Sequence, residues 1–315
     1  MILRLLQWWP VRTDAAAWHP DLAGLRRLVR AGDWAGVEAY FDGLPPRADR
    51  STAVLFVANE RGAEHFLQRV VDAQRDSSLA RTLLGARFIV IGWQARTAAY
   101  AKNVSAAQWK VFGDYLGRAE RVLADAVAID PANSAAWTER ITTARALSLG
   151  PDESRRRYER AAEHCDTPYR AQVQLLQNLC PKWGGSFPEV HAFAERCLTG
   201  AEPGSLSGAI AANAQLEQAL QENYVRDIRQ YLARADVRRR LEAAAERTVL
   251  HADFAPGHGW VNAHSAFAAA FSLGGHIAAA RPHLQALGPF VAPYGWEQVS
   301  AKWPDLVRQA RRDAR

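Results

Sequence analysis

The sequence predicts an all-α protein in which antiparallel helical hairpins stack as a solenoid. Alanine, the residue with the highest helix propensity, occurs 60 times in 315 residues, whereas Ile, Thr and Val are comparatively sparse. Apolar residues recur at helical spacing along most of the chain, and helix-start signals follow one another at a regular interval. No alternating run bounded by turn residues predicts a strand.

The first hairpin is predicted over 21–31 and 34–41, because Gly32 separates two apolar stripes of helical period. The dipeptide Pro45-Pro46 closes it. Further helices are predicted over 51–60, 62–74 and 78–100. We assign residues 1–75 to N-terminal hairpins, for which a capping role is one interpretation.

Capping signals define the remaining helices. Ser105 and Gln108 form a capping-box pattern for a helix that runs to about residue 129, and Asn133 is a predicted N-cap. Pro151 and Pro168 fit the first positions of two more helices, and Ser186 with Glu189 is a second capping box. Other predicted helices are 205–223, 225–234, 237–252, 258–272 and 275–287, before a basic tail over 304–315. Residues 76–235 are assigned to central repeats and 236–315 to C-terminal repeats with this tail.

Small residues are needed where the two helices of a hairpin cross closely, and small and aromatic residues recur within these pairs of helices. One unit contains Ala107, Ala119 and Ala126 before Pro131, and the next contains Trp137, Ile141, Tyr158 and Ala161. This pattern resembles the tetratricopeptide repeat, most closely over about 100–200. The segment 176–186, which ends in Lys-Trp-Gly-Gly-Ser, is similar to a loop of uncharacterised bacterial helical-repeat proteins. The resemblance implies stacked hairpins that bind a peptide or protein in a concave groove, and it carries over no catalytic residue.

The predicted helix 133–147 supplies the first groove candidates. If Trp137, Ile141 and Ala144 are buried, the other face presents Thr138, Thr142 and Arg145, which share a stripe at spacings of four and three. A solvated helix face is the alternative interpretation of these three residues.

The loop around Lys182 and Trp183 supplies the next candidates, together with His191. Gly184 and Gly185 permit a tight turn, and the helix that follows has unpaired N–H groups that suit a phosphate or carboxylate, to which Lys182 would add a positive charge. The loop lacks the spacing of a nucleotide-binding motif. A structural turn in which Trp183 fills the joint between repeats is the alternative.

Tryptophan is unusually frequent, with 11 residues. Internal tryptophans are expected to fill helix joints. Trp8 and Trp9 precede any clear helix, so we keep them as candidates for an interface or a pocket lid.

We expect no cofactor and no metal site. Five histidines lie between residues 251 and 283, but their spacing matches no zinc motif; only His276 and His283, seven residues apart, could share a helix face. The cysteines Cys165, Cys180 and Cys197 show no paired clustering, so buried thiols are the favoured interpretation. This low, odd count suits a reducing cytoplasm. No secretory signal or membrane span is predicted.

The net charge of +6 does not indicate nucleic-acid binding, because acidic residues are interspersed among the 39 basic ones. Two functions remain open. The favoured one is a module that binds a protein, a peptide or a second copy of itself through the groove. The alternative is an all-α enzyme or biosynthetic accessory protein with a small-molecule pocket, for which we would inspect Lys182, His191, Arg145, Glu60 and Glu64.

Overall fold

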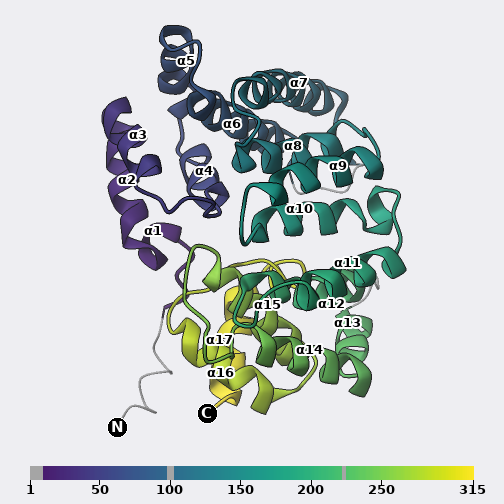
Figure 1. Cartoon of the computed structure of the whole chain (residues 1–315). Helices are drawn as coiled ribbons and strands as arrows, with labels where there is room; N and C mark the ends of the chain where they lie inside the picture. Colours follow the sequence, from purple (N-terminus) through teal and green to yellow (C-terminus); the bar gives the residue numbers. More distant parts are fainter. Residues whose placement is uncertain (1–9, 98–102, 222–224) are drawn as a thin grey trace. The chain divides into compact units, whose positions relative to one another are not determined.

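The computed structural model describes residues 10–97, 103–221 and 225–315 (Figure 1). These residues form 17 α-helices and contain no strand, apart from a single bridge between Arg12 and Phe290. The all-α prediction is therefore confirmed for the described part of the chain. Within the same ranges, no helix combines the length and the apolar character needed to cross a membrane.

The chain divides into two compact units. One spans His19–Asn178, and the other combines Leu179–Arg315 with the N-terminal residues through Trp18. Their boundaries do not coincide with residues 75 and 235, where the sequence analysis placed its limits. The division into three groups of repeats therefore stays a prediction.

The His19–Asn178 unit is a succession of helices joined by short turns. They are α2 (Pro20–Ala31), α3 (Trp34–Asp42), α4 (Ser51–Ala58), α5 (Ala63–Ala73), α6 (Ser78–Arg96), α7 (Ala106–Ile129), α8 (Ser134–Ala146), α9 (Pro151–Glu163) and α10 (Tyr169–Asn178). The hairpin of α2 and α3 has the predicted turn, where Gly32 adopts a left-handed φ of 69°.

Polar side chains begin several of these helices as predicted. Ser105 and Gln108 form a capping box at the start of α7. The Asn133 side chain accepts the N–H of Ala136 at the start of α8. These caps satisfy N–H groups that have no acceptor within the helix.

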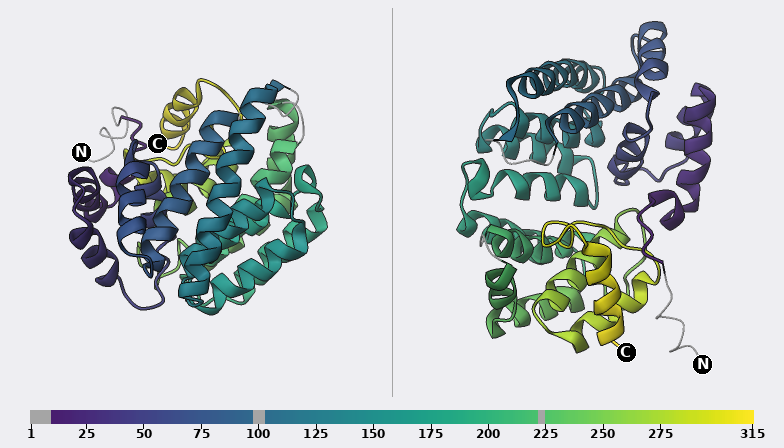
Figure 2. Two further views of the ribbon diagram at one scale, coloured as in Figure 1. Left: turned by 90° about the horizontal axis from the view of Figure 1, so that it is seen from above. Right: turned by 180° about the vertical axis from the view of Figure 1, so that it is seen from behind.

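The most extensive helix contact in this unit lies between α6 and α7, which run side by side (Figure 2). A Cβ atom on Gly85 would lie 2.5 Å from Cγ of Leu123, and one on Gly92 would lie 2.3 Å from Cδ2 of Leu116. The two glycines therefore permit the close packing. Of the predicted small residues on α7, Ala119 and Ala126 are fully buried, but Ala107 is exposed and its predicted role in helix crossing is wrong.

The second unit begins with α1 (Ala15–Trp18) and continues with the short helix η3 (Pro181–Trp183). It further contains α11 (Phe187–Thr199), η4 (Leu206–Ala209), α12 (Ile210–Gln221), α13 (Val225–Leu232), α14 (Ala235–Arg247), α15 (Trp260–Leu273), α16 (Ile277–Leu287) and α17 (Trp303–Asp313). Helix α15 contacts α12, α14 and α16, and Phe267, Phe271 and Trp296 are fully buried in the core.

Candidate functional site

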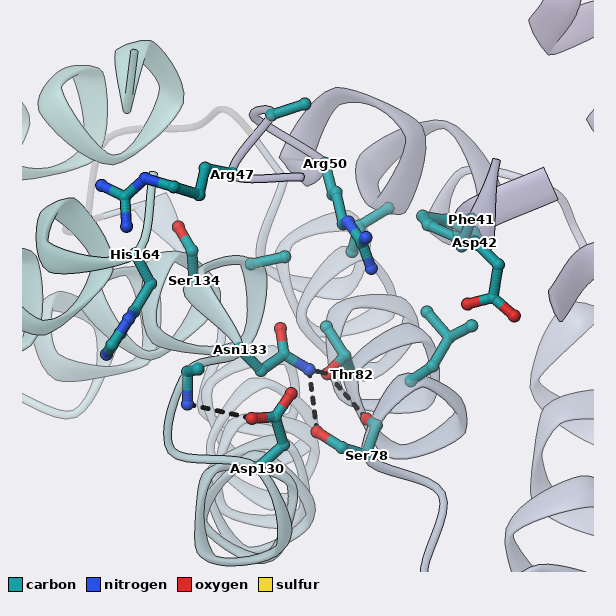
Figure 3. A pocket seen from close by; sticks show the side chains of 15 residues that line it. Phe41, Asp42, Arg47, Arg50, Ser78, Thr82, Asp130, Asn133, Ser134 and His164 are labelled. Atoms are coloured by element: carbon teal, nitrogen blue, oxygen red, sulfur yellow. Dashed lines mark hydrogen bonds between the residues drawn. The ribbon is translucent and has the colours of Figure 1, made fainter. Parts of the chain in front are cut away.

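A cavity of about 410 Å³ lies within the His19–Asn178 unit (Figure 3). Separate parts of the chain form its walls: the end of α3, the turn before α4, the first turn of α6, the segment that begins α8 and the residue after α9. The polar residues that line it are Asp42, Arg47, Arg50, Ser78, Thr82, Asp130, Asn133, Ser134 and His164. Its size lies within the range of pockets that bind ligands.

A hydrogen-bond network fixes one wall of the cavity. Asn133 Nδ2 donates to Ser78 Oγ over 2.8 Å and to Thr82 Oγ1 over 3.0 Å, as Figure 3 shows. Ser78 Oγ in turn donates to the carbonyl oxygen of Ala126. Since Asn133 also caps α8, the starts of α6 and α8 are held together in one arrangement.

Two arginines of the turn before α4, Arg47 and Arg50, line the cavity. Arg47 Nε lies 2.5 Å from Oδ1 of Asp166, and its Nη1 donates to the carbonyl oxygen of Glu163. Arg50 is half-buried, and its side chain extends into the middle of the pocket drawn in Figure 3. Within the described residues, no hydrogen bond, ion pair or ring contact involves the Arg50 guanidinium.

Three other ionisable side chains line the same cavity: His164, Asp42 and Asp130. His164 is half-buried, with Nε2 3.9 Å from Oε2 of Glu163. Asp42 is exposed at the end of α3, and Asp130 accepts the N–H of Ala132. The cavity therefore presents groups of both signs, of which the Arg50 guanidinium is placed to contact a ligand.

The expected groove on α8 is not formed as predicted. Trp137, Ile141 and Ala144 are buried as predicted, but Thr138 and Thr142 are also buried, at 1% and 4% exposure. The reason is that α8 contacts α4, α6, α7, α9 and α10, so little of its surface remains open. The expectation that these two threonines face a groove is therefore wrong.

Arg145 is half-buried, and its Nη1 lies 3.4 Å from the carbonyl oxygen of Gln174. Its guanidinium carbon lies 5.9 Å from the centre of the Trp93 ring. The residue does not line the cavity. The structure thus assigns it contacts with α6 and α10.

The loop around Lys182 belongs to the second unit and has clear structural contacts. Lys182 Nζ lies 2.6 Å from Oε2 of Glu217 on α12. Trp183 is half-buried in η3, and a Cβ on Gly185 would lie 2.1 Å from the carbonyl oxygen of Leu179. Ser186 caps α11 by accepting the N–H of Glu189. The glycines therefore permit a tight turn, and Lys182 forms an internal ion pair.

His191 takes part in a polar chain of the same unit. Its Nε2 lies 2.5 Å from Oε1 of Gln218, which also accepts the hydroxyl of Tyr231 over 2.9 Å. Tyr231 donates to Gln215 as well. His191 therefore contacts the neutral side chain of Gln218, through which it is linked to Tyr231.

Glu60 and Glu64, the two acidic candidates for catalysis, are held by arginines. Glu60 accepts from Arg26 over 2.8 Å and from Arg30 over 2.9 Å. Burial is the largest influence on Glu64 and opposes its ionisation, but the hydrogen bond and charge of Arg87, together with a backbone hydrogen bond, outweigh it and lower the pKa of Glu64. Neither carboxylate lines the cavity.

The structure brings together two histidines that the sequence analysis did not pair. Nδ1 of His264 lies 3.2 Å from Nδ1 of His283, and both residues are buried. Phe267 and Phe271 stack on the His283 ring. His276, which we considered as a partner of His283, instead contacts the carbonyl oxygen of Leu232.

Sequence reasoning missed Arg47, Arg50 and His164 as site residues. These three residues lie in separate segments of the sequence. Of the cavity wall, the sequence predicted only the helix cap at Asn133. Trp8 and Trp9 lie outside the described residues. Comparison of the chain with protein-family models and with curated proteins finds no match.

Proposed function

We propose that this chain is a helical-repeat binding protein that holds a peptide segment of a protein partner in the cavity of its His19–Asn178 unit. The observation that carries the proposal is the cavity itself, about 410 Å³, with the half-buried Arg50 guanidinium extending into it. A pocket of this kind can take a few side chains of an extended segment. The partner is a protein, and a second copy of this chain is one candidate.

The succession of helix contacts supports a stack of hairpins like that of tetratricopeptide repeats. Helix α6 contacts α7, α7 contacts α8, α8 contacts α9, and α9 contacts α10. In a solenoid each hairpin buries an apolar face against the next one, so neighbours in sequence are neighbours in space. Three buried free thiols are consistent with a cytoplasmic location for the protein.

Binding is favoured over catalysis by the surroundings of the candidate catalytic groups. An enzyme needs titratable side chains that converge where a substrate can sit. Glu60 is held by Arg26 and Arg30, and Glu64 is held by Arg87. Neither carboxylate is available in this arrangement as a base in the cavity.

The test selects a random peptide library against the full chain and measures the affinity of the enriched peptides. Ala132→Trp places a large side chain on an exposed residue of the cavity wall. Ala107→Trp is the matched control, because Ala107 is exposed on α7 and does not line the cavity. Thermal melts show whether both variants fold like the wild type.

We expect peptides that bind the wild type and Ala107→Trp equally and lose at least about tenfold in affinity for Ala132→Trp. The absence of any enriched peptide, or equal binding to all three proteins, would contradict the proposal.

A further inference from the structure

We infer that the group captured in the cavity is a singly charged carboxylate of the partner, held by Arg50 and by the first turn of α8. This inference rests on the proposed function, since it names the chemistry of the segment that the cavity would take. It is carried by the charge, burial and contacts of the residues in the cavity wall.

Arg47 and Arg50 differ in their contacts. Arg47 already has an acidic partner in Asp166, whereas the contacts among the described residues include none for the Arg50 guanidinium. A half-buried guanidinium has lost part of its hydration, and pairing with an anion compensates for that loss. The planar guanidinium presents N–H groups that match both oxygens of a carboxylate.

The start of α8 forms part of the cavity wall. Asn133, Ser134 and Ala135 all line the cavity. The first N–H groups of a helix have no acceptor within it and carry a partial positive charge. The Asn133 side chain satisfies the N–H of Ala136, which leaves the N–H groups of Ser134 and Ala135 to be matched by an oxygen of the ligand.

The charge balance favours a carboxylate over a phosphate. Asp42 and Asp130 line the same cavity, and Arg47 is already paired with Asp166, so Arg50 shares the cavity with two carboxylates. Both carboxylates would repel a dianion strongly. A ligand with a single negative charge can contact Arg50 and is repelled less by these carboxylates. The ligand oxygen can come from an acidic side chain or from a peptide C-terminus.

The experiment titrates the full chain with four small probes by isothermal calorimetry. Glutaramate, which has a single carboxylate, represents an acidic side chain and N-acetylglycine a peptide C-terminus, while glutaramide is the uncharged counterpart and inorganic phosphate at pH 8 the dianion. We expect both carboxylates to bind more tightly than glutaramide and phosphate. The tighter of the two identifies the source of the carboxylate.

Arg50→Gln is the decisive variant, and Arg121→Gln is its control because Arg121 is exposed on α7 outside the cavity. The Arg50 side chain makes no capping hydrogen bond, so its loss leaves α4 intact. We expect Arg50→Gln to weaken carboxylate binding by about tenfold and Arg121→Gln to leave it unchanged. Arg50→Lys should fall between them, because it keeps the charge and loses the planar fork.

The result that overturns the inference is equal carboxylate binding by the wild type and Arg50→Gln, or binding of glutaramide or phosphate as tight as that of the carboxylates. Ala132→Trp separates this failure from that of the proposed function. If Ala132→Trp abolishes peptide binding while Arg50→Gln does not affect carboxylate binding, the inference that Arg50 holds a carboxylate is wrong and the proposed function stands. If peptide binding is also indifferent to Ala132→Trp, the cavity is not the site.

Discussion

Lys182 forms an ion pair with Glu217, whose carboxylate lies 2.6 Å from Nζ and belongs to a residue only 5% exposed. The hydroxyl of Tyr294 donates to the other oxygen of the same carboxylate. Lys182, which the sequence suggested as part of a site for a bound anion, thus pairs with a carboxylate of the chain itself. It links the turn after Cys180 to α12 within one unit.

Lys182→Met should therefore lower the free energy of unfolding. The change removes the cation from a buried carboxylate, and such a loss costs about 1–3 kcal/mol. Urea unfolding followed by circular dichroism measures it. Lys302→Met is the control, because Lys302 is exposed near the start of α17. Equal stability of the two variants would show that the ion pair contributes nothing.

Arg157→Met should be more damaging. Arg157 is 2% exposed, and its Nη1 and Nη2 donate to the two oxygens of Glu120 over 2.9 and 2.8 Å. Removal of one partner from a buried pair costs about 3–5 kcal/mol. The control Arg155→Met removes a pair with Asp152, which is 96% exposed, and should cost less than about 1 kcal/mol. Urea unfolding of both variants tests the difference, and similar losses would contradict it.

The His264–His283 pair should make the second unit sensitive to acid. Burial lowers the pKa of His264 to about 4, and burial together with the neighbouring His264 lowers the pKa of His283 to about 3. In an unfolded chain both titrate near pH 6.5. As the pH falls below 6.5 the unfolded state binds protons that the native state does not, so stability declines progressively towards pH 3.

Over that window each histidine lowers the free energy of unfolding by about 3 to 4 kcal/mol. His283→Phe keeps an aromatic ring between Phe267 and Phe271 and removes one titrating group, so the variant should lose less stability between pH 7 and pH 4 than the wild type. His65→Phe is the control, since the His65 side chain is 81% exposed. Urea unfolding at several pH values gives the dependence of the free energy of unfolding on pH. An identical dependence for the wild type and His283→Phe would refute the assignment of the acid sensitivity to this pair.

The cysteines should be unreactive in the native protein. Cys165, Cys180 and Cys197 are free and buried. Burial raises the pKa of the Cys165 thiol to about 12, and the nearby Asp49 carboxylate adds to the effect. Because the thiolate is the reacting species, an aromatic disulfide reagent at pH 8 should label none of them rapidly. Three thiols should react in concentrated urea, and fast native labelling would contradict the burial.

Much of the local structure could be predicted because its causes lie within a few residues. The capping box of Ser105 and Gln108, the cap at Asn133 and the turn at Gly32 are all present. Each depends on a short-range hydrogen bond or a backbone angle. Helix packing depends on distant residues instead, which is why Ala119 is buried whereas Ala107, in the same predicted repeat unit, is exposed.

The candidate site could not be predicted for the same reason. Helical spacing places Thr138 and Thr142 on one stripe but does not reveal that five other helices cover α8. The cavity unites Arg50, Ser78, Asn133 and His164, which are far apart in sequence. Nothing local distinguishes Arg50, since the role we propose for it follows from the lack of an acidic partner among the contacts of the described residues.

Photo-cross-linking gives the most direct test of the central claim that the cavity of the His19–Asn178 unit holds the partner segment. A library-selected peptide that carries benzoylphenylalanine is irradiated with the full chain, and mass spectrometry of the digest locates the attachment. The account predicts cross-links at Ala48, Leu79 and Ala132, which line the cavity, with loss of labelling when unlabelled peptide competes. Competable cross-links confined to residues 179–315 would contradict it.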